Sequence, residues 1–358
     1  PGGRGVSGHV KVLDRSGKVR ELTPYFESAR GLAWSASGDE IWFTAGTARS
    51  NRALWAVTLA GTQRLIQAVP GSLTLWDIAQ DGRVLMTRDE QRRAIRGMAP
   101  GERDERDLSW YDNSGVASIS RDGRLILLGD RFGIYVRGTD GSDPVKIRSD
   151  GLGDDLSPDG KWALVTADGQ RTLVLVPTGA GSPKPVPTHD ISNYRGARWF
   201  PDGTSLLFTG VDKTGATRSF RQSVDGGPPE PLTPPKVIAL AVSPKGDMLA
   251  TTDAKGLALL RVGGASPTFI EGSRPGDRPI AWKDDGGSLW LFRRNELPGT
   301  ITRLDLRTGL REAFRTLNPP DAAGVYSIID AQVTPSGHAY AYTYTRLLSQ
   351  LYLVGGLK

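Results

Sequence analysis

Residues 153–166 read GDDLSPDGKWALVT, a short apolar strand, a turn that ends in Gly160 and a second apolar strand. In the turn Ser157–Gly160, proline presets φ, aspartate caps locally and glycine takes the positive φ that closes a tight hairpin. Seven other stretches follow the same plan: GLAWSASGDEIWFTA (31–45), LTLWDIAQDGRVLMT (73–87), GVASISRDGRLILLG (115–129), GARWFPDGTSLLFTG (196–210), ALAVSPKGDMLATT (239–252), PIAWKDDGGSLWLFR (279–293) and DAQVTPSGHAYAYTY (330–344). Their turn glycines recur every 37 to 51 residues, close to the period of about 40 to 45 residues for one four-stranded propeller blade.

Apolar residues keep a fixed distance from these glycines. The residues four positions before them are all apolar: Trp34, Ile78, Ile119, Leu156, Trp199, Val242, Trp282 and Val333. Six positions before, Asp154 is the one polar residue among eight. A spacing of two places both columns on one face of a strand. Two more strand-like runs follow most hairpins, and no stretch shows the periodicity of a helix.

These repeats predict an all-β protein, a β-propeller of eight four-stranded blades, because flat units must stack to bury their faces. A seven-blade ring with an irregular extra unit is the alternative. We expect residues 1–358 to form a single propeller domain, closed by pairing of the N- and C-terminal strands. One strand is then left over, either Val10–Leu13 or Leu351–Val354. The first residues, PGGRGVSGHV, contain no initiator Met, so we also expect a fragment of a longer protein.

Composition limits the partners. The net charge is +6, but the basic residues are scattered among acidic ones, so we predict no nucleic-acid partner. No run of about 18 apolar residues is present, which predicts no direct membrane insertion. Without cysteine the chain has no disulfide, zinc-thiolate site or cysteine nucleophile. The expected partner is a protein or a small polar ligand at the propeller mouth, with no cofactor.

No catalytic residues and no metal site are predicted. The three histidines, His9, His189 and His338, fall in separate blades or loops, and we expect each at the surface. A G-x-S-x-G nucleophile elbow is absent. Paired carboxylates near the axis would be needed for the alternative of a polysaccharide-processing enzyme.

The innermost strands supply the first group of candidate site residues. Side chains five positions before each glycine face away from the apolar columns, and the polar ones are Asp77, Ser118, Asp155, Arg198 and Gln332. One interpretation is a water-filled channel with charges paired across it. The other is a site for a small cation or polar ligand formed by Asp77, Asp154 and Asp155.

Loops that lead into the innermost strands supply the second group. They carry aromatic residues and arginine, the types that anchor interfaces. These residues are Tyr25, Phe26, Trp110, Tyr111, Tyr194, Arg195, Arg278 and Tyr326. The alternative is that the aromatic rings pack between neighbouring blades. The predicted ligand-binding residues are Asp77, Asp154, Asp155, Tyr194, Arg195, Arg198, Arg278, Tyr326 and Gln332.

The SPDG-type turns followed by apolar strands resemble the TolB-type, WD-repeat-like propeller family over nearly the whole chain. A narrower resemblance is to the C-terminal propeller of bacterial eukaryotic-like serine/threonine protein kinases. It is carried by EIWFTAG (40–46), MAPGERDERDLSW (98–110), LVLVPTGAGSPKPVP (173–187), ARWFPDGTSLLFTG (197–210) and YAYTYTRLLSQLYLVGGLK (340–358). The kinase motifs themselves, a Gly-rich loop, VAIK, HRD and DFG, are absent.

This resemblance implies a non-catalytic sensor or interaction domain of a bacterial receptor-like kinase that binds a ligand or a protein. It also implies the extracytoplasmic part of a membrane-anchored protein, with a cytoplasmic location as the alternative. The alternatives in function are the polysaccharide-processing enzyme and a structural spacer.

Overall fold

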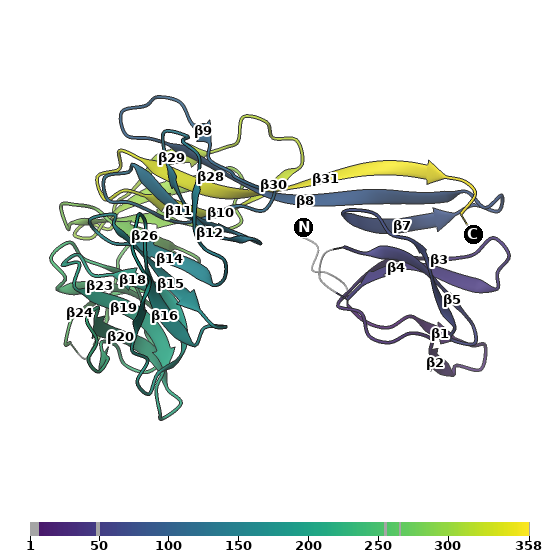
Figure 1. Cartoon of the computed structure of the whole chain (residues 1–358), viewed down its shortest axis with the longest axis horizontal. Coiled ribbons are helices and arrows are strands. Elements are labelled where there is room, and N and C mark those ends of the chain that lie inside the picture. Colours follow the sequence, from purple (N-terminus) through teal and green to yellow (C-terminus); the bar gives the residue numbers. More distant parts are fainter. Residues whose placement is uncertain (1–6, 48–50, 254–255, 265, 358) are drawn as a thin grey trace. The chain divides into compact units, whose positions relative to one another are not determined.

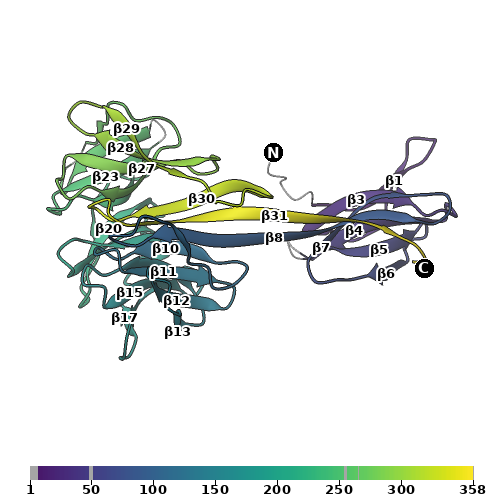
Figure 2. The same cartoon turned by 90° about the horizontal axis from the view of Figure 1, so that it is seen from above.

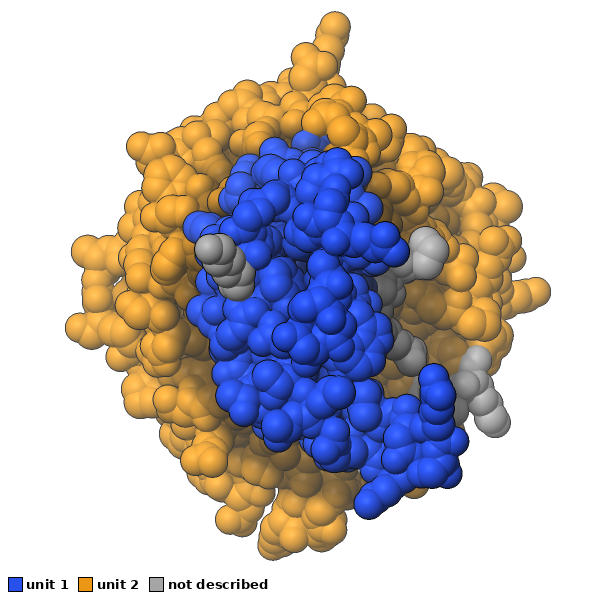
Figure 3. Space-filling model, turned by 90° about the vertical axis from the view of Figure 1, so that its right-hand side faces the viewer, with its two compact units in different colours: residues 1–92, 346–358 blue, residues 93–345 orange. Residues whose placement is uncertain are grey.

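The structure is a computed structural model that describes residues 7–47, 51–253, 256–264 and 266–357. Within these ranges every regular element is a β-strand, numbered β1 to β31 in chain order (Figure 1). The chain divides into two compact units, which Figure 3 colours separately. Unit 1 contains residues 1–92 and 346–358, and unit 2 contains residues 93–345. The chain leaves unit 1 within β8 (Val84–Met98) and returns to it within β31 (Tyr340–Val354).

All eight predicted hairpins are present. The turn glycines have φ between 70° and 81°, the left-handed region that glycine adopts without a steric penalty. Each donates its N–H to the carbonyl of the residue three positions earlier, as Gly160 does to Ser157 at 2.8 Å. In that turn Oδ1 of Asp159 accepts the Ser157 hydroxyl and the Lys161 N–H, at 2.6 and 3.1 Å. The predicted turn chemistry is therefore confirmed.

Five antiparallel sheets of unit 2 each contain four strands that are consecutive in the chain (Figure 2). We call each sheet a blade and its first strand the inner strand. The blades are β10–β13 (Gly115–Ile119, Leu125–Asp130, Gly133–Gly138, Val145–Arg148), β14–β17 (Leu152–Leu156, Trp162–Ala167, Thr172–Pro177, Lys184–Val186), β18–β21 (Ser192–Trp199, Ser205–Val211, Thr217–Ser223, Glu230–Pro231), β22–β25 (Ile238–Val242, Met248–Asp253, Gly256–Arg261, Thr268–Phe269) and β26–β29 (Arg278–Trp282, Ser288–Phe292, Gly299–Asp305, Arg311–Leu317).

A sixth blade of unit 2 is assembled from two distant parts of the chain. β30 (Val325–Val333) is its inner strand, and it is followed in the sheet by β31, β8 and β9 (Arg106–Asp107). β8 and β31 lie next to each other in this sheet (Figures 1 and 2). Residues 340–345 of β31 and 93–98 of β8 belong to unit 2.

The inner strands of unit 2 form a closed ring. β10 contacts both β14 and β30, β14 contacts β18, and β26 contacts both β22 and β30. β22 contacts β19 and β20 of the preceding blade, which completes the circle. The N–H of Val116 donates to the hydroxyl of Thr343 at 2.9 Å, which joins the first blade of unit 2 to the last. Equivalent loops of the six blades therefore lie on the same face of the ring.

Inner strands share a β-bulge that the sequence pattern does not reveal. Their pairing register shifts at the same place, for example between Gly153 and Asp155 and between Pro279 and Ala281. In unit 1 it shifts between Leu75 and Asp77. A bulge sets two residues against one and breaks the strict alternation of faces. The prediction that two apolar columns share one buried face is therefore only partly correct: Trp199 is 8% exposed, but Trp76 is 59% exposed.

Unit 1 holds the other two repeats. Its strands are β1 (Lys11–Leu13), β2 (Val19–Glu21), β3 (Ser28–Trp34), β4 (Glu40–Gly46), β5 (Ala53–Thr58), β6 (Gln63–Gln67) and β7 (Ser72–Ile78), with the parts of β8 and β31 that belong to it. β3–β6 form a four-stranded blade, and β3 contacts β7. Apolar side chains such as Trp42, Leu54 and Leu75 fill the space between the two sheets.

The all-β class, the propeller type and the eight repeats are confirmed. Among the described residues β1 pairs with β2, and β31 pairs with β30 and β8, in place of the predicted pairing of the N- and C-terminal strands. A hairpin needs only the short turn between β1 and β2, whereas the predicted pairing would join the two ends of the chain. Leu351–Val354, one of the two candidates for a leftover strand, is the end of β31.

Candidate functional site

Asp155 joins three neighbouring inner strands of unit 2. Its Oδ1 accepts the hydroxyl of Ser118 on β10 at 2.6 Å and the N–H of Leu156 at 3.0 Å. Its Oδ2 accepts the N–H of Trp199 on β18 at 3.0 Å. Both carboxylate oxygens are thus used to hold blades together.

Asp154 is the residue at the bulge of β14, and it also reaches the next blade. Its Oδ2 accepts the Thr166 hydroxyl at 2.6 Å, and its Oδ1 accepts the Ala197 N–H at 3.3 Å. Burial raises the pKa of Asp154 to about 6. The effect of burial is larger than the opposing effects of these hydrogen bonds and of the nearby Arg198 charge, which lower the pKa. The Asp154 carboxyl group is therefore expected to lose its proton near pH 6.

Two inner strands of unit 2 carry arginine side chains whose charges interact. Arg198 on β18 donates through Nη1 to the carbonyl of Asp154 at 2.7 Å. Arg278 begins β26 and is partly buried. β22 lies between β18 and β26 in the ring, yet the charges of Arg198 and Arg278 interact. Both residues lie on inner strands of the ring.

Arg294 and Asp330 complete this group. Arg294 lies in the loop between β27 and β28, and its Nη2 contacts Oδ2 of Asp330 on β30 at 2.6 Å. The charges of Arg294 and Asp330 both act on Arg278. Neither residue was predicted from the sequence, because neither lies in the column of side chains that was expected to line the axis.

Loops that precede the inner strands, and loops that join the second strand of a blade to the third, define one face of unit 2. We call it the mouth face. An aromatic cluster lies there on the first blade: Trp110, Tyr111 and Phe132 are 41%, 44% and 45% exposed. The rings of Tyr111 and Phe132 are 5.1 Å apart, and that of Tyr111 is 6.4 Å from the buried Tyr135. Arg131 lies over the Phe132 ring at 4.7 Å.

The other predicted aromatic residues divide between surface and core. Tyr194 is only 1% exposed, packs against Phe208 at 5.0 Å and donates its hydroxyl to the Thr188 carbonyl at 2.8 Å. Burial raises its pKa to about 12. Tyr194 therefore packs in the core, which favours the alternative for this aromatic residue over a role in ligand binding. Phe26 is also buried, whereas Tyr326 is 43% exposed.

The remaining predicted residues are not brought into one group. Arg195 is exposed at the start of the same blade as Arg198. Gln332 is partly buried on β30, and its amide makes no hydrogen bond with another described residue. Asp77 is exposed on β7 in unit 1, whereas Asp154 and Asp155 lie in unit 2. The described part of the chain holds no group of three or more His, Asp or Glu side chains that suits a metal ion.

A polar hollow of about 280 Å³ lies beside the arginine group on the β26–β29 blade. Arg311 donates to both oxygens of the fully buried Asp277 carboxylate, at 2.6 and 3.2 Å. Arg293 lies 3.9 Å from the same carboxylate and 3.0 Å from Glu296. The charges of this hollow are thus largely paired within the protein.

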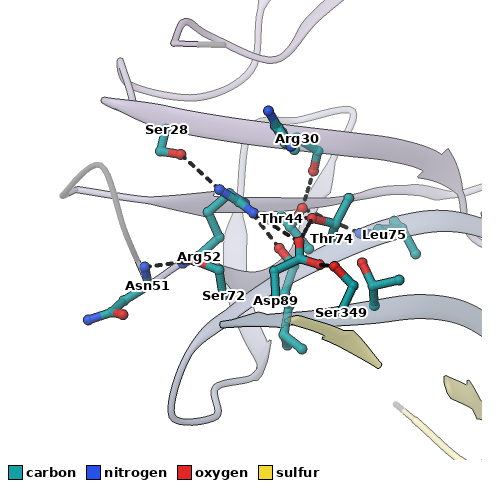
Figure 4. Close-up of polar contacts among 12 residues, drawn as sticks. Ser28, Arg30, Thr44, Asn51, Arg52, Ser72, Thr74, Leu75, Asp89 and Ser349 are labelled. Carbon is teal, nitrogen blue, oxygen red and sulfur yellow. Dashed lines mark hydrogen bonds and ion pairs between the residues drawn. The ribbon is translucent and has the colours of Figure 1, made fainter. Parts of the chain in front are cut away.

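Unit 1 contains a buried ion pair between Arg52 and Asp89 at 3.4 Å (Figure 4). Arg52 also donates to the Leu73 carbonyl, while Asp89 accepts the hydroxyls of Thr74 and Ser349 at 2.7 and 2.8 Å. These contacts connect β5, β7, β8 and β31 and leave no oxygen of Asp89 without a donor. We assign this cluster to the stability of unit 1.

Comparisons with known proteins agree with the fold. No family model and no curated protein matches the chain. A protein assigned as TolB from Agrobacterium tumefaciens has a TM-score of 0.54 and 19% identity, and the match covers 72% of this chain and 99% of that one. A chain of a nidogen/laminin complex has a TM-score of 0.47 and 14% identity, with 64% and 94% covered. TolB from Acinetobacter baumannii has a TM-score of 0.33 and 14% identity, with 86% and 60% covered.

Only the first of these similarities carries an argument, and at 19% identity it concerns the fold alone. No helix among the described residues is long and apolar enough to span a membrane. The structure therefore has the fold of a TolB-type β-propeller.

Proposed function

We propose that this chain is a non-catalytic binding module whose mouth face in unit 2 binds a segment of a partner protein. The observation that carries the proposal is the exposed cluster of Trp110, Tyr111 and Phe132. Aromatic side chains of this kind dominate the binding energy of protein interfaces. A surface that exposes three of them together marks a site of interaction.

The cluster is held rigidly before any partner arrives. Tyr111 packs on the buried ring of Tyr135, and the hydroxyl of Ser114 accepts the N–H groups of Trp110 and Tyr111, both at 3.1 Å. Rings fixed in this way lose little conformational entropy on binding, so more of the contact energy remains as affinity. The closed ring of six blades gives these loops a stable base.

Asp154 and Asp155 support the non-catalytic assignment. Their oxygens accept hydrogen bonds from Thr166, Ala197, Ser118 and Trp199, so both carboxylates take part in joining blades. The two residues are also adjacent on one strand, whereas a glycosidase places two carboxylates on opposite sides of a sugar.

The finer proposal is that this module is the sensor or interaction domain of a bacterial receptor-like serine/threonine kinase, outside the cytoplasm. It is supported by the sequence resemblance of segments such as residues 197–210 and 340–358. In that setting the mouth face would bind an extracellular or periplasmic partner. Joining the chain to its upstream region and measuring autophosphorylation with and without the partner tests this step.

Selection of a random peptide library on phage against the whole chain tests the binding proposal. We expect selected peptides to bind the wild-type chain and to lose about tenfold or more in affinity on W110A or Y111A. F269A is the matched control, because Phe269 is 57% exposed but lies on the outer strand β25. Failure to select any binder, or equal binding by W110A, Y111A and F269A, would contradict the proposal.

A further inference from the structure

Arg278 is a cation that its surroundings do not neutralise. Its guanidinium makes no hydrogen bond and no ion pair with another described residue, although the side chain is partly buried at the start of the inner strand β26. Burial lowers the pKa of Arg278, and the charges of Arg294 and Arg198 also lower it, while the charge of Asp330 opposes them. A guanidinium has five N–H donors, and those of Arg278 have no acceptor among the described residues.

The acids nearby already have donors. Oδ2 of Asp330 binds Arg294 at 2.6 Å, and Oδ1 accepts the N–H of Ala331 at 3.0 Å. Arg198 interacts with the charge of Asp154, and burial makes the ionised form of that carboxyl less stable. Asp154, Asp155 and Asp330 thus have donors of their own, and Arg278 makes no ion pair with them or with any other described residue.

We propose that the axis of unit 2, at its mouth face, binds a side-chain carboxylate from an acidic peptide segment, with Arg278 as the main contact. This inference rests on the proposed function, because the segment is the one that the Trp110–Tyr111–Phe132 cluster binds. A carboxylate supplies two acceptors in one plane, which match the paired N–H groups of a guanidinium. It would also offset the mutual repulsion of Arg198, Arg278 and Arg294.

A small cation is the less suitable ligand for this axis. The two carboxylates of Asp154 and Asp155 accept hydrogen bonds from protein donors, and Asp77 belongs to unit 1. The guanidinium of Arg278 and the charge of Arg294 would repel a cation at this position. The unpaired guanidinium of Arg278 therefore favours an anion, and the charge of the whole chain, +6, agrees in sign with an acidic partner.

Isothermal titration at low ionic strength tests the proposal with two probes on the whole chain. One probe is a tetraglutamate peptide with both ends blocked, which offers only side-chain carboxylates, and the other is free succinate. We expect the peptide to bind the wild-type chain. We expect the R278Q substitution to lower the affinity for the peptide about tenfold or more. R278K keeps the charge but loses the planar geometry, so we expect an intermediate affinity. R307Q is the matched control, because Arg307 is an exposed arginine far along the blade from the inner strand.

Thermal unfolding of R278Q, R278K and R307Q shows whether each variant is folded before its affinity is compared. Equal binding of the peptide by wild type and R278Q would overturn the inference, as would no binding of either probe to the wild type. Binding of succinate as tightly as the peptide would overturn the assignment to a peptide segment.

The proposed function can fail separately. If library peptides lose affinity on W110A but keep it on R278Q, the binding module stands and the carboxylate site is wrong. If binding of tetraglutamate requires Arg278 while W110A and Y111A leave the affinity for the library peptides unchanged, the carboxylate site stands and the aromatic cluster is not part of the interface.

Discussion

The hydroxyl group of Tyr340 donates a hydrogen bond to Oε1 of Glu105 at 2.8 Å, and these two residues are 235 positions apart in the chain. Tyr342 donates to Oε2 of the same carboxylate at 2.8 Å, and Arg96 reaches that oxygen at 3.3 Å. Burial and the charge of Glu105 raise the pKa of both phenols, so they remain protonated donors. This carboxylate joins the two parts of the composite blade and so closes the ring of unit 2.

Replacing Glu105 by alanine should lower the free energy of unfolding by about 2 to 3 kcal/mol, because Arg96 and two phenols lose their acceptor. Urea denaturation followed by circular dichroism measures the change. E312A is the control: Glu312 pairs with Arg303 at 3.0 Å but is 51% exposed, so we expect less than about 1 kcal/mol. Equal effects of E105A and E312A would mean that Glu105 does not close the ring.

Asp154 should make stability depend on pH. Its pKa is about 6 in the folded chain and near 3.8 in the unfolded chain, so the folded state binds the proton more tightly. This contribution is complete below about pH 4 and is lost as the pH rises past 6, a change of about 3 kcal/mol. In D154N the amide can accept from Ala197 and donate to Thr166, so this part of the pH dependence should disappear.

Denaturation of wild type and D154N at a series of pH values between about 4 and 8 measures the difference. Parallel curves would show that Asp154 keeps an ordinary pKa. D155N is the contrasting variant. The Asp155 carboxylate of the wild type accepts three hydrogen bonds, and the NH₂ group of an asparagine would face one or more of these donors instead of accepting from them. We expect D155N to lose about 1 to 2 kcal/mol at neutral pH.

Two turn glycines separate backbone strain from packing. Gly123 and Gly286 hold the same turn position, with φ of 75° and 70°. A Cβ at Gly286 would meet nothing within 4 Å, but one at Gly123 would lie 2.6 Å from Cβ of Ala339 and 2.9 Å from Cγ of Pro100. G286A should therefore lower the free energy of unfolding by about 1 kcal/mol, through the backbone alone. G123A should lower it by about 1 to 3 kcal/mol more, because its Cβ also meets neighbouring atoms. Thermal unfolding compares them, and equal losses would contradict the packing of this turn.

The ion pair of unit 1 should be sensitive to loss of either partner. D89A leaves the buried Arg52 guanidinium without its acid, and we expect a loss of about 3 kcal/mol. The double variant R52M/D89L should recover part of that loss. Hydrogen exchange of amides in β3–β7 measures both, with R64A as the control, since the Arg64–Glu40 pair is partly exposed. A larger loss in the double variant than in D89A would contradict a structural role for the pair.

The hairpins were predictable because their signals are local. Each turn ends in glycine, and in all but one of them proline or aspartate comes shortly before that glycine. Eight copies at a regular spacing identify the blades. The grouping of blades was not predictable in this way. It depends on β8 and β31, two long strands far apart in the sequence that pair with each other and have residues in both units.

The candidate site was predicted only in part for a related reason. Arg198 and Arg278 were identified from their strands, but the interaction of their charges depends on closure of the ring. Arg294 and Phe132 lie in loops joining the second and third strands, which carry no recurring motif. Tyr194 shares the sequence character of an exposed interface residue, and only the packing against Phe208 shows that it belongs to the core.

Hydrogen–deuterium exchange of the whole chain, with and without a peptide selected from the library, tests the binding account most directly. The account predicts slower exchange in residues 108–114 and 131–132 and at the start of β26, all on the mouth face. Slower exchange confined to the turns of the opposite face, such as 158–160 and 284–286, would contradict it.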